Sequence, residues 1–252
     1  MNFRTIRRLM YLKRARYRHG HGIHSPFLFR LITCVVEDKR KQPEYELVKK
    51  LRKSALKILY KNSDPSFTSL YHQFKLSPSK TKKLFKKVEL PMKYGKVIFR
   101  LIREFNPSCI VNYGPSFGIN LALMALAKND SSVYQVINNV SYQTVYAKLL
   151  KEAGIQNIYY NEDQISTVIP EFVIINFPDS PERSWSITEK FMGSKGDDDV
   201  LIIRGIHESG EMEALWNKAI EYDRVRVSLD LFEIGILLFR KGLQKENFIH
   251  RF

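Results

Sequence analysis

Apolar residues in the first hundred positions recur with the spacing of helices. In residues 94–105 four apolar side chains fall on one side of a helix, because they repeat with a period of about 3.6 residues. The same spacing predicts helices over residues 3–18 and 44–60. Ser25 is expected to cap a further helix that begins at Pro26, since proline suits the first helical turn. The front of the chain is therefore expected to be helical.

After Pro107 short apolar runs alternate with helical patterns, which predicts a parallel sheet with helices on both faces. Only Asp230–Glu233 separates the last two runs, so these are expected to pair as an antiparallel hairpin. We expect an α/β fold with a doubly wound seven-stranded sheet, six strands parallel and the seventh antiparallel. This domain would span residues 106–252, behind a basic, mainly helical extension over residues 1–105. The predicted strands are Cys109–Tyr113, Val133–Ile137, Ile158–Tyr160, Phe172–Asn176, Val200–Arg204, Arg224–Leu229 and Ile234–Arg240.

The composition is that of a globular protein. The chain has 252 residues, 44% of them apolar, which is enough to bury a core without disulfides or metals. No apolar run approaches the roughly 20 residues that cross a bilayer, and the N-terminus lacks the apolar segment of a secretory signal. We expect a cytoplasmic protein in which Cys34 and Cys109 are buried, reduced thiols.

Charge is distributed unevenly along the chain. Residues 1–103 carry a net charge of +21 and residues 104–252 a net charge of −6, which together give +15. A basic half of this kind indicates an anionic partner, such as a nucleic acid or an anionic membrane surface, or else a solvated helical surface. Residues 1–18, with seven Lys and Arg and no acid, are the candidate for the membrane surface. The candidates for nucleic-acid phosphates are Lys80, Lys82, Lys83, Lys86 and Lys87.

A glycine-rich loop follows the first predicted strand, at residues 112–118. In an open parallel sheet, ligands bind beyond the carboxyl ends of the strands, so this loop is where binding chemistry is expected. Glycine permits a tight turn and close approach of the backbone to a ligand. The N-terminus of the helix that follows favours an anionic group such as a carboxylate.

The turn from Gly114 to Gly118 resembles the first motif of class I S-adenosylmethionine (SAM) methyltransferases, in which an acidic residue precedes Gly-x-x-x-Gly. Further stretches, in order, resemble a group of SAM methyltransferase-like proteins from Bacteroidetes-type bacteria, and they cover nearly the whole chain. These stretches are His19–Phe27, Lys93–Gly95, Ile206–Ser209, Glu211–Glu213, Asp230–Phe232 and Phe239–Lys241.

The resemblance implies a Rossmann-like methyltransferase fold, SAM as the cofactor, and methyl transfer to an oxygen or nitrogen of a small molecule. His207 is the candidate base, because histidine titrates near neutral pH. No metal is expected, since arginine stands where the family has paired aspartates, and arginine cannot ligate a cation. The implied cofactor-binding residues are Tyr113, Gly114, Pro115, Ser116 and Gly118 for the methionine part, Asn138 or Asn139 for the ribose, Asp163 for the adenine, and Asn176.

The cofactor motifs are degenerate, because the family's acidic residues are replaced at four strand ends. The replacements are Asn112 in the first motif, Asn138-Asn139 after the second strand, Asn176 after the fourth and Arg204 after the fifth. Each such change is expected to weaken cofactor binding by about 1–3 kcal/mol. Two hypotheses follow: an active SAM-dependent methyltransferase, or a pseudoenzyme that acts through its basic N-terminal region on an anionic partner. The sequence predicts neither the substrate nor the oligomeric state.

Two other patterns have competing interpretations. The loop also matches the G-x-S-x-G elbow of α/β-hydrolases, with Ser116 as nucleophile, but no strands are predicted before Cys109 and a hydrolase needs several. His19, His21 and His24 form either a metal cluster or a structural turn, and the absence of a nearby carboxylate or cysteine favours the turn.

Overall fold

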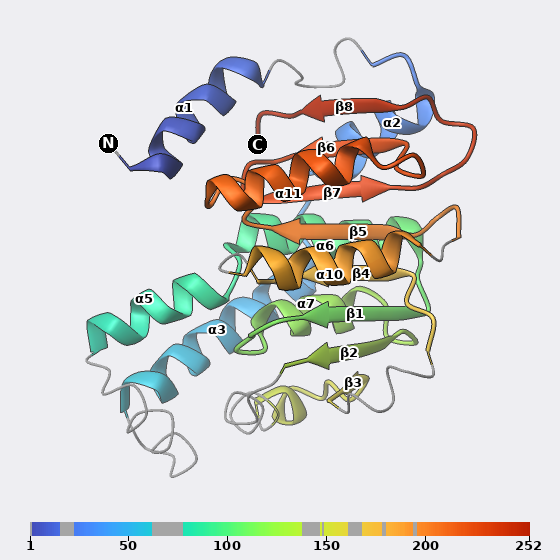
Figure 1. Ribbon diagram of the computed structural model, residues 1–252. Helices are drawn as coiled ribbons and strands as arrows, with labels where there is room; N and C mark the ends of the chain where they lie inside the picture. The colour runs from blue at the N-terminus through green and yellow to red at the C-terminus, as the bar shows by residue number, and fades with distance from the viewer. Residues whose placement is uncertain are drawn as a thin grey trace.

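A computed structural model describes residues 2–15, 23–61, 78–137, 147, 149–160, 168–177, 180–193 and 196–252, with the backbone alone for 58–61, 78 and 81. One sheet runs through the molecule in the order β3-β2-β1-β4-β5-β7-β6-β8 (Figure 1). Its strands are β1 (Cys109–Tyr113), β2 (Ser132–Val136), β3 (Ile158–Tyr159), β4 (Phe172–Ile175), β5 (Val200–Arg204), β6 (Val227–Asp230), β7 (Ile234–Leu238) and β8 (Glu246–Ile249).

The sheet confirms the predicted hairpin and corrects the strand count. Strand β7 pairs antiparallel with both β5 and β6, and the other pairings are parallel. The described residues contain eight strands rather than seven, because β8 adds to the edge beside β6. Strand β8 lacks the apolar pattern of the others: Phe248 alone among its residues is buried. A polar edge strand of this kind gives no clear period in the sequence.

Helices cover both faces of the sheet. In Figure 1, α10 and α11 lie on the near face, and α6, α7 and α3 lie on the far face. The side chains of β1 alternate accordingly, with Ile110 in the core on the far face and Val111 in the core on the near face. The helices are α1 (Phe3–Arg14), α2 (Pro26–Arg30), the π-helix η1 (Leu31–Val36), α3 (Pro43–Lys61), α5 (Pro78–Val88), α6 (Met92–Phe105), α7 (Ile119–Ala127), α10 (Pro181–Met192) and α11 (Gly210–Glu221).

The described residues before β1 are helical where they are regular, and they share their core with the sheet. Ser25 caps α2 as the sequence predicts, since its Oγ accepts a hydrogen bond from the Leu28 amide at 3.4 Å. Buried side chains of α6, such as Ile98 and Ile102, belong to the same hydrophobic cluster as Ile110 of β1. The domain boundary near residue 105 stays a prediction. Among the described helices, none combines the length and hydropathy that crossing a bilayer requires.

One sequence prediction about the cysteines is wrong. Cys109 lies in β1 and is buried, which raises the pKa of its thiol to about 11. Cys34 lies in η1 and is exposed, because it falls on the outer side of that helix, between the buried Ile32 and Val35.

This difference predicts the thiol reactivity of the native protein. Because a thiol reacts as the thiolate and must be accessible, Cys34 is expected to react with Ellman's reagent rapidly and Cys109 only on unfolding. Stopped-flow absorbance should therefore show one fast thiol per chain in buffer and two in denaturant. A Cys34→Ser variant should lose the fast phase, and two fast thiols in buffer would contradict the burial of Cys109.

Candidate cofactor site

The glycine-rich loop lies where the sequence predicts it, between the carboxyl end of β1 and the N-terminus of α7. Gly114 has a φ of +114°, and a Cβ there would overlap the backbone carbonyl of Asn176. Its amide donates to the Val136 carbonyl at 2.9 Å, and its carbonyl accepts from the Gln135 side chain. A glycine is therefore required at position 114 by contacts within the protein.

A buried carboxylate, that of Glu89, caps the loop. Glu89 follows α5, is 1% exposed, and directs both carboxylate oxygens at the N-terminus of α7. It accepts hydrogen bonds from the Ser116 hydroxyl at 3.0 Å, the Ile119 amide at 3.4 Å and the Asn120 amide at 3.1 Å. The Phe117 amide and the Asn120 side-chain amide, the latter at 2.6 Å, also donate to it. A helix N-terminus is an anion site, and here the anion belongs to the protein.

The electrostatics of Glu89 follow from this placement. Complete burial raises the pKa of the Glu89 carboxyl, and the donors from Ser116, Phe117, Asn120 and Ile119 act against that rise. Five donors among the described residues face the two oxygens, and hydrogen bonds to a carboxylate favour its ionised form. Removing this group would leave buried amide donors without an acceptor, so it stabilises the loop.

Asn176 and Arg204, at the ends of β4 and β5, close the other side of the loop. The Asn176 side-chain amide donates to the carbonyls of Pro115 at 2.6 Å and Val88 at 3.2 Å. Arg204 donates to the same Val88 carbonyl at 2.6 Å and to the Asn176 side-chain oxygen at 2.7 Å. Burial lowers the pKa of Arg204, and Glu233 opposes this, with 3.6 Å between Arg204 Nε and Glu233 Oε1. Asn176 and Arg204 thus attach Val88, the neighbour of Glu89, to the ends of β4 and β5.

Asn112 in β1 also has a partner within the protein. Its side-chain amide donates to Gln135 Oε1 at 2.6 Å. Both side chains are buried, at 3% and 0% exposure. Tyr113, at the end of β1, is partly buried and packs against the near-face core. The end of β1 therefore joins β2 through an amide pair.

The loop does not fit the methionine end of SAM as the family holds it. The resemblance assigns that end to this loop, where the cofactor's carboxylate would need the donors at the start of α7, and Glu89 accepts from them. The Gly118 amide donates to Ser116 Oγ at 3.0 Å, so it too has a partner within the protein. The structure thus brings Gly114, Pro115, Ser116, Gly118 and Asn176 together, around a carboxylate of the chain itself.

Three of the predicted cofactor residues, Asn138, Asn139 and Asp163, lie outside the described residues, and their roles stay predictions. His19 and His21 lie outside them too, while His24 is exposed. Within the described ranges no three His, Cys, Asp or Glu residues are grouped to hold a metal. Ser116 bonds to a carboxylate rather than to a histidine, and the described residues before β1 contain no strand, so nothing supports the hydrolase alternative.

His207 lies just after β5, under α1. Its Nε2 is 2.7 Å from Asp230 Oδ2, and its ring stacks on Phe232, with 5.3 Å between the ring centroids. Tyr11 of α1 covers the ring at 6.3 Å, which leaves the His207 side chain 12% exposed. None of these partners belongs to the network around Glu89. The role of His207 as a base stays a prediction.

Helix α1 is anchored here by charge, which the sequence did not reveal. Arg4 pairs with Glu208 and Glu233, and Arg7 pairs with Glu213. The basic residues of α1 on this side therefore face acidic residues of the α/β domain.

Glu89 was also missed by the sequence analysis, although one signal could have found it. It is the single acidic residue in residues 65–103, and it lies between the apolar Val88 and Leu90. A lone acid in a lysine-rich, locally apolar segment indicates a carboxylate with a buried partner.

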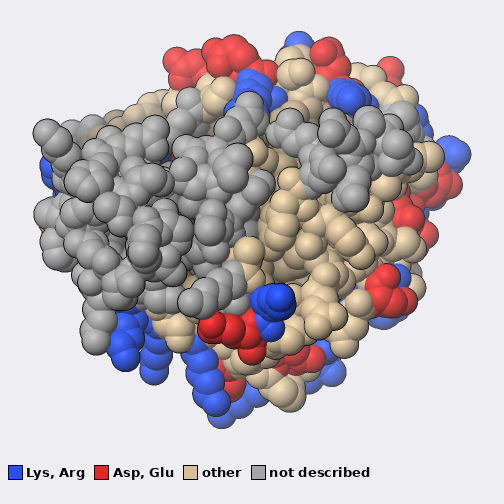
Figure 2. Space-filling model, turned by 90° about the horizontal axis from the view of Figure 1, so that it is seen from below, with Lys and Arg blue, Asp and Glu red and all other residues tan. Residues whose placement is uncertain are grey.

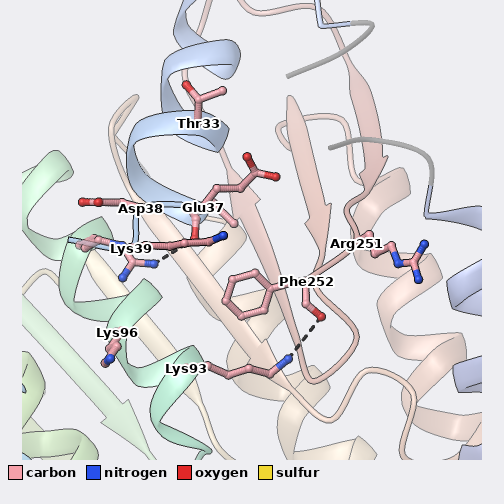
Figure 3. Close-up of a pocket in the computed structure, with 10 residues that line it drawn as sticks. Thr33, Glu37, Asp38, Lys39, Lys93, Lys96, Arg251 and Phe252 are labelled. Atoms are coloured by element: carbon pink, nitrogen blue, oxygen red, sulfur yellow. Dashed lines mark hydrogen bonds between the residues drawn. The ribbon is translucent and has the colours of Figure 1, made fainter. Parts of the chain in front are cut away.

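A cavity of about 860 Å³ lies elsewhere, between η1, the start of α6 and the C-terminal residues (Figure 3). Lys93 crosses it, donating to the Phe252 carbonyl at 3.3 Å and lying 4.8 Å from the centre of the Phe252 ring. Its wall carries both acids, such as Glu37 and Asp38, and further lysines. Basic side chains outnumber acidic ones in this lining, and its residues are not those of the glycine-rich loop.

Known structures of methyltransferases share this fold. A proposed O-methyltransferase from Klebsiella pneumoniae matches with a TM-score of 0.56 and 10% identity, over 84% of this chain and 94% of its own. The O-methyltransferase TomG from Streptomyces achromogenes, solved with SAM, matches with a TM-score of 0.52 and 14% identity, over 71% and 91%. An O-methyltransferase from Bacillus cereus, solved with SAH, gives 0.52 and 12%, over 84% and 97%. No protein-family model and no curated protein matches the sequence.

The chain has the fold of the SAM-dependent methyltransferases, as its sheet order, its antiparallel β7 and these similarities show. At such low identity the similarity establishes the fold alone.

Proposed function

We propose that this chain is a binding protein built on the methyltransferase fold, which does not hold SAM and acts in the cytoplasm on an anionic partner through its basic helices. The observation that carries the proposal is the carboxylate of Glu89 at the N-terminus of α7. Its oxygens accept the hydrogen bonds of the α7 amides that the carboxylate of a cofactor would need. Function on this fold depends on the site rather than on the fold, so the change at the site decides the proposal.

The replaced acids support the same proposal. The Asn176 side chain forms three hydrogen bonds and Arg204 forms two, one of them shared, and Asn112 is paired with Gln135. These side chains have gained structural partners where the family has ligand-binding carboxylates. A cofactor would have to displace Glu89 and break a buried network to reach the loop.

A second candidate function is methyl transfer from SAM to a small molecule. It is favoured by the O-methyltransferases of the same fold that were solved with SAM or SAH. In that case Glu89 would leave the N-terminus of α7 when the cofactor arrives.

Isothermal titration calorimetry with SAM and with SAH separates the two candidates. We expect no saturable heat at cofactor concentrations up to about 1 mM, which corresponds to binding weaker than about 4 kcal/mol. An active O-methyltransferase titrated in the same buffer controls for the ligand. Saturable binding in the micromolar range would refute the proposal and favour the enzyme.

A further inference from the structure

Two parts of the basic half of the chain use their charge differently. In α1, Arg4 and Arg7 pair with glutamates of the α/β domain, so part of its charge holds the helix in place. In α3 and α5 most of the lysines are exposed to solvent. Helix α1 also exposes Arg8, Lys13 and Arg14, but most of the exposed lysines in the described part of the basic half lie on α3 and α5.

Helix α3 buries one side and exposes lysines on the other. Tyr45, Val48, Leu51 and Ala55 are in the core, at helical spacing. The exposed lysines between and beyond them are Lys50, Lys53 and Lys57. Since the rise is 1.5 Å per residue, Lys53 and Lys57 lie about 6 Å apart along the axis.

Helix α5 repeats this arrangement beside α3. Phe85 and Val88 are buried, and Arg52 of α3 lies over the Phe85 ring, 4.8 Å from its centre. The two helices are in contact and lie side by side in Figure 1. The exposed lysines of α5 include Lys80, Lys82, Lys83 and Lys86. We call these four, together with Lys50, Lys53 and Lys57, the lysine face.

Little negative charge opposes the lysine face. The acids of α3 are Glu44 and Glu46 at its first turn, where Glu44 pairs with Arg103 and Glu46 with Lys49. Helix α5 contains no acid. Figure 2 shows several Lys and Arg side chains projecting together at the lower left margin of the molecule, while both signs of charge occur along the upper margin. Helices α3 and α5 therefore present a positively charged surface with few acids of their own.

The lysine face lacks the side chains that a membrane surface requires. The large apolar residues that are exposed in the described parts of the chain are Phe3, Ile6, Leu9, Phe29, Tyr159 and Ile169, none of them in α3 or α5. An interfacial helix inserts such residues among lipids, whereas lysine stems alone give only electrostatic attraction. A hydrated polyanion with regularly spaced charges suits this surface better.

We propose that the lysine face binds the phosphate backbone of double-stranded nucleic acid. Lysine contacts phosphates as a point charge and carries no base specificity, so the contact is independent of sequence and weakens with salt. This inference names the anionic partner of the proposed function and rests on it to that extent. The two proposals are tested separately, because calorimetry measures the binding of SAM and is independent of whether the protein binds nucleic acid.

Fluorescence anisotropy of the full chain with labelled duplex RNA and duplex DNA tests the proposal, in a titration of potassium chloride. A variant with Lys53, Lys57, Lys82 and Lys86 changed to Gln should bind at least about tenfold more weakly near 100 mM salt. Its plot of log affinity against log salt should be shallower by about 3 to 4, since each lost phosphate contact removes about 0.9. Comparing the two duplexes shows whether RNA or DNA is preferred.

The matched control removes the same charge elsewhere. Lys151, Lys190, Lys218 and Lys241 are exposed and lie outside α3 and α5, and changing them to Gln should alter affinity by less than about threefold. An equal loss in both variants would overturn the proposal, because only net charge would then matter. Absence of duplex binding, or binding only to phosphatidylserine vesicles, would also overturn it.

Discussion

A Glu89→Ala variant is expected to unfold with a free energy about 3 kcal/mol below that of the wild-type protein. The substitution leaves the buried amides of Phe117 and Asn120 without an acceptor, and the N-terminus of α7 loses its negative charge. Urea denaturation followed by circular dichroism measures the difference. Glu46→Ala, at an exposed position paired with Lys49, should change stability by less than about 0.5 kcal/mol.

Adding a carboxylate from solution to the Glu89→Ala variant tests the role of the missing carboxylate directly. If the carboxylate itself stabilises the loop, acetate should raise the melting temperature of Glu89→Ala and leave that of the wild-type protein unchanged. Chloride at the same ionic strength is the control for screening. Wild-type stability in Glu89→Ala, or an equal response of both proteins to acetate, would contradict the account.

The second large effect is expected at Gly114. Changing Gly114 to Ala should destabilise the protein by about 3 kcal/mol or more, because a Cβ would overlap the Asn176 carbonyl and φ is +114°. Gly154 is the control for backbone strain alone, because it has a φ of +74° but open space around it. Gly154→Ala should lower the free energy of unfolding by only about 1 kcal/mol. Urea denaturation without any cofactor makes the comparison.

Equal losses at the two glycines would mean that the β1 loop does not press against the end of β4. A stable Gly114→Ala variant would indicate that this glycine is retained for a ligand rather than for packing. Either result would weaken the argument that the loop is closed by the chain itself.

The sequence predicted the fold well because central strands of its sheet, such as β4 and β7, are buried and almost entirely apolar. The strands from β1 to β7 and the reversal at β7 follow from short apolar runs and from a connection too short for a crossover. Strand β8 was missed because it is a polar edge strand in which only Phe248 is buried. Edge strands are specified by pairing with a neighbour, here β6, and pairing leaves no period in the sequence.

The sequence predicted that several of the candidate residues lie close together, but not which groups their side chains contact, and their roles in binding stay predictions. The glycine-rich loop, Asn176 and Arg204 come together as expected at the carboxyl ends of the strands. The sequence has asparagine or arginine at these strand ends, but it could not show what their side chains bind. Glu89 lies 27 residues before Ser116, and only the packing of the segment after α5 onto α7 brings the two together.

The most direct measurement is a crystal structure of the wild-type protein grown with millimolar SAH. Our account predicts that the Glu89 carboxylate lies within hydrogen-bonding distance of the Phe117 and Asn120 amides, with no nucleoside bound at the loop. A structure in which the SAH carboxylate takes those amides and Glu89 has moved away would contradict it.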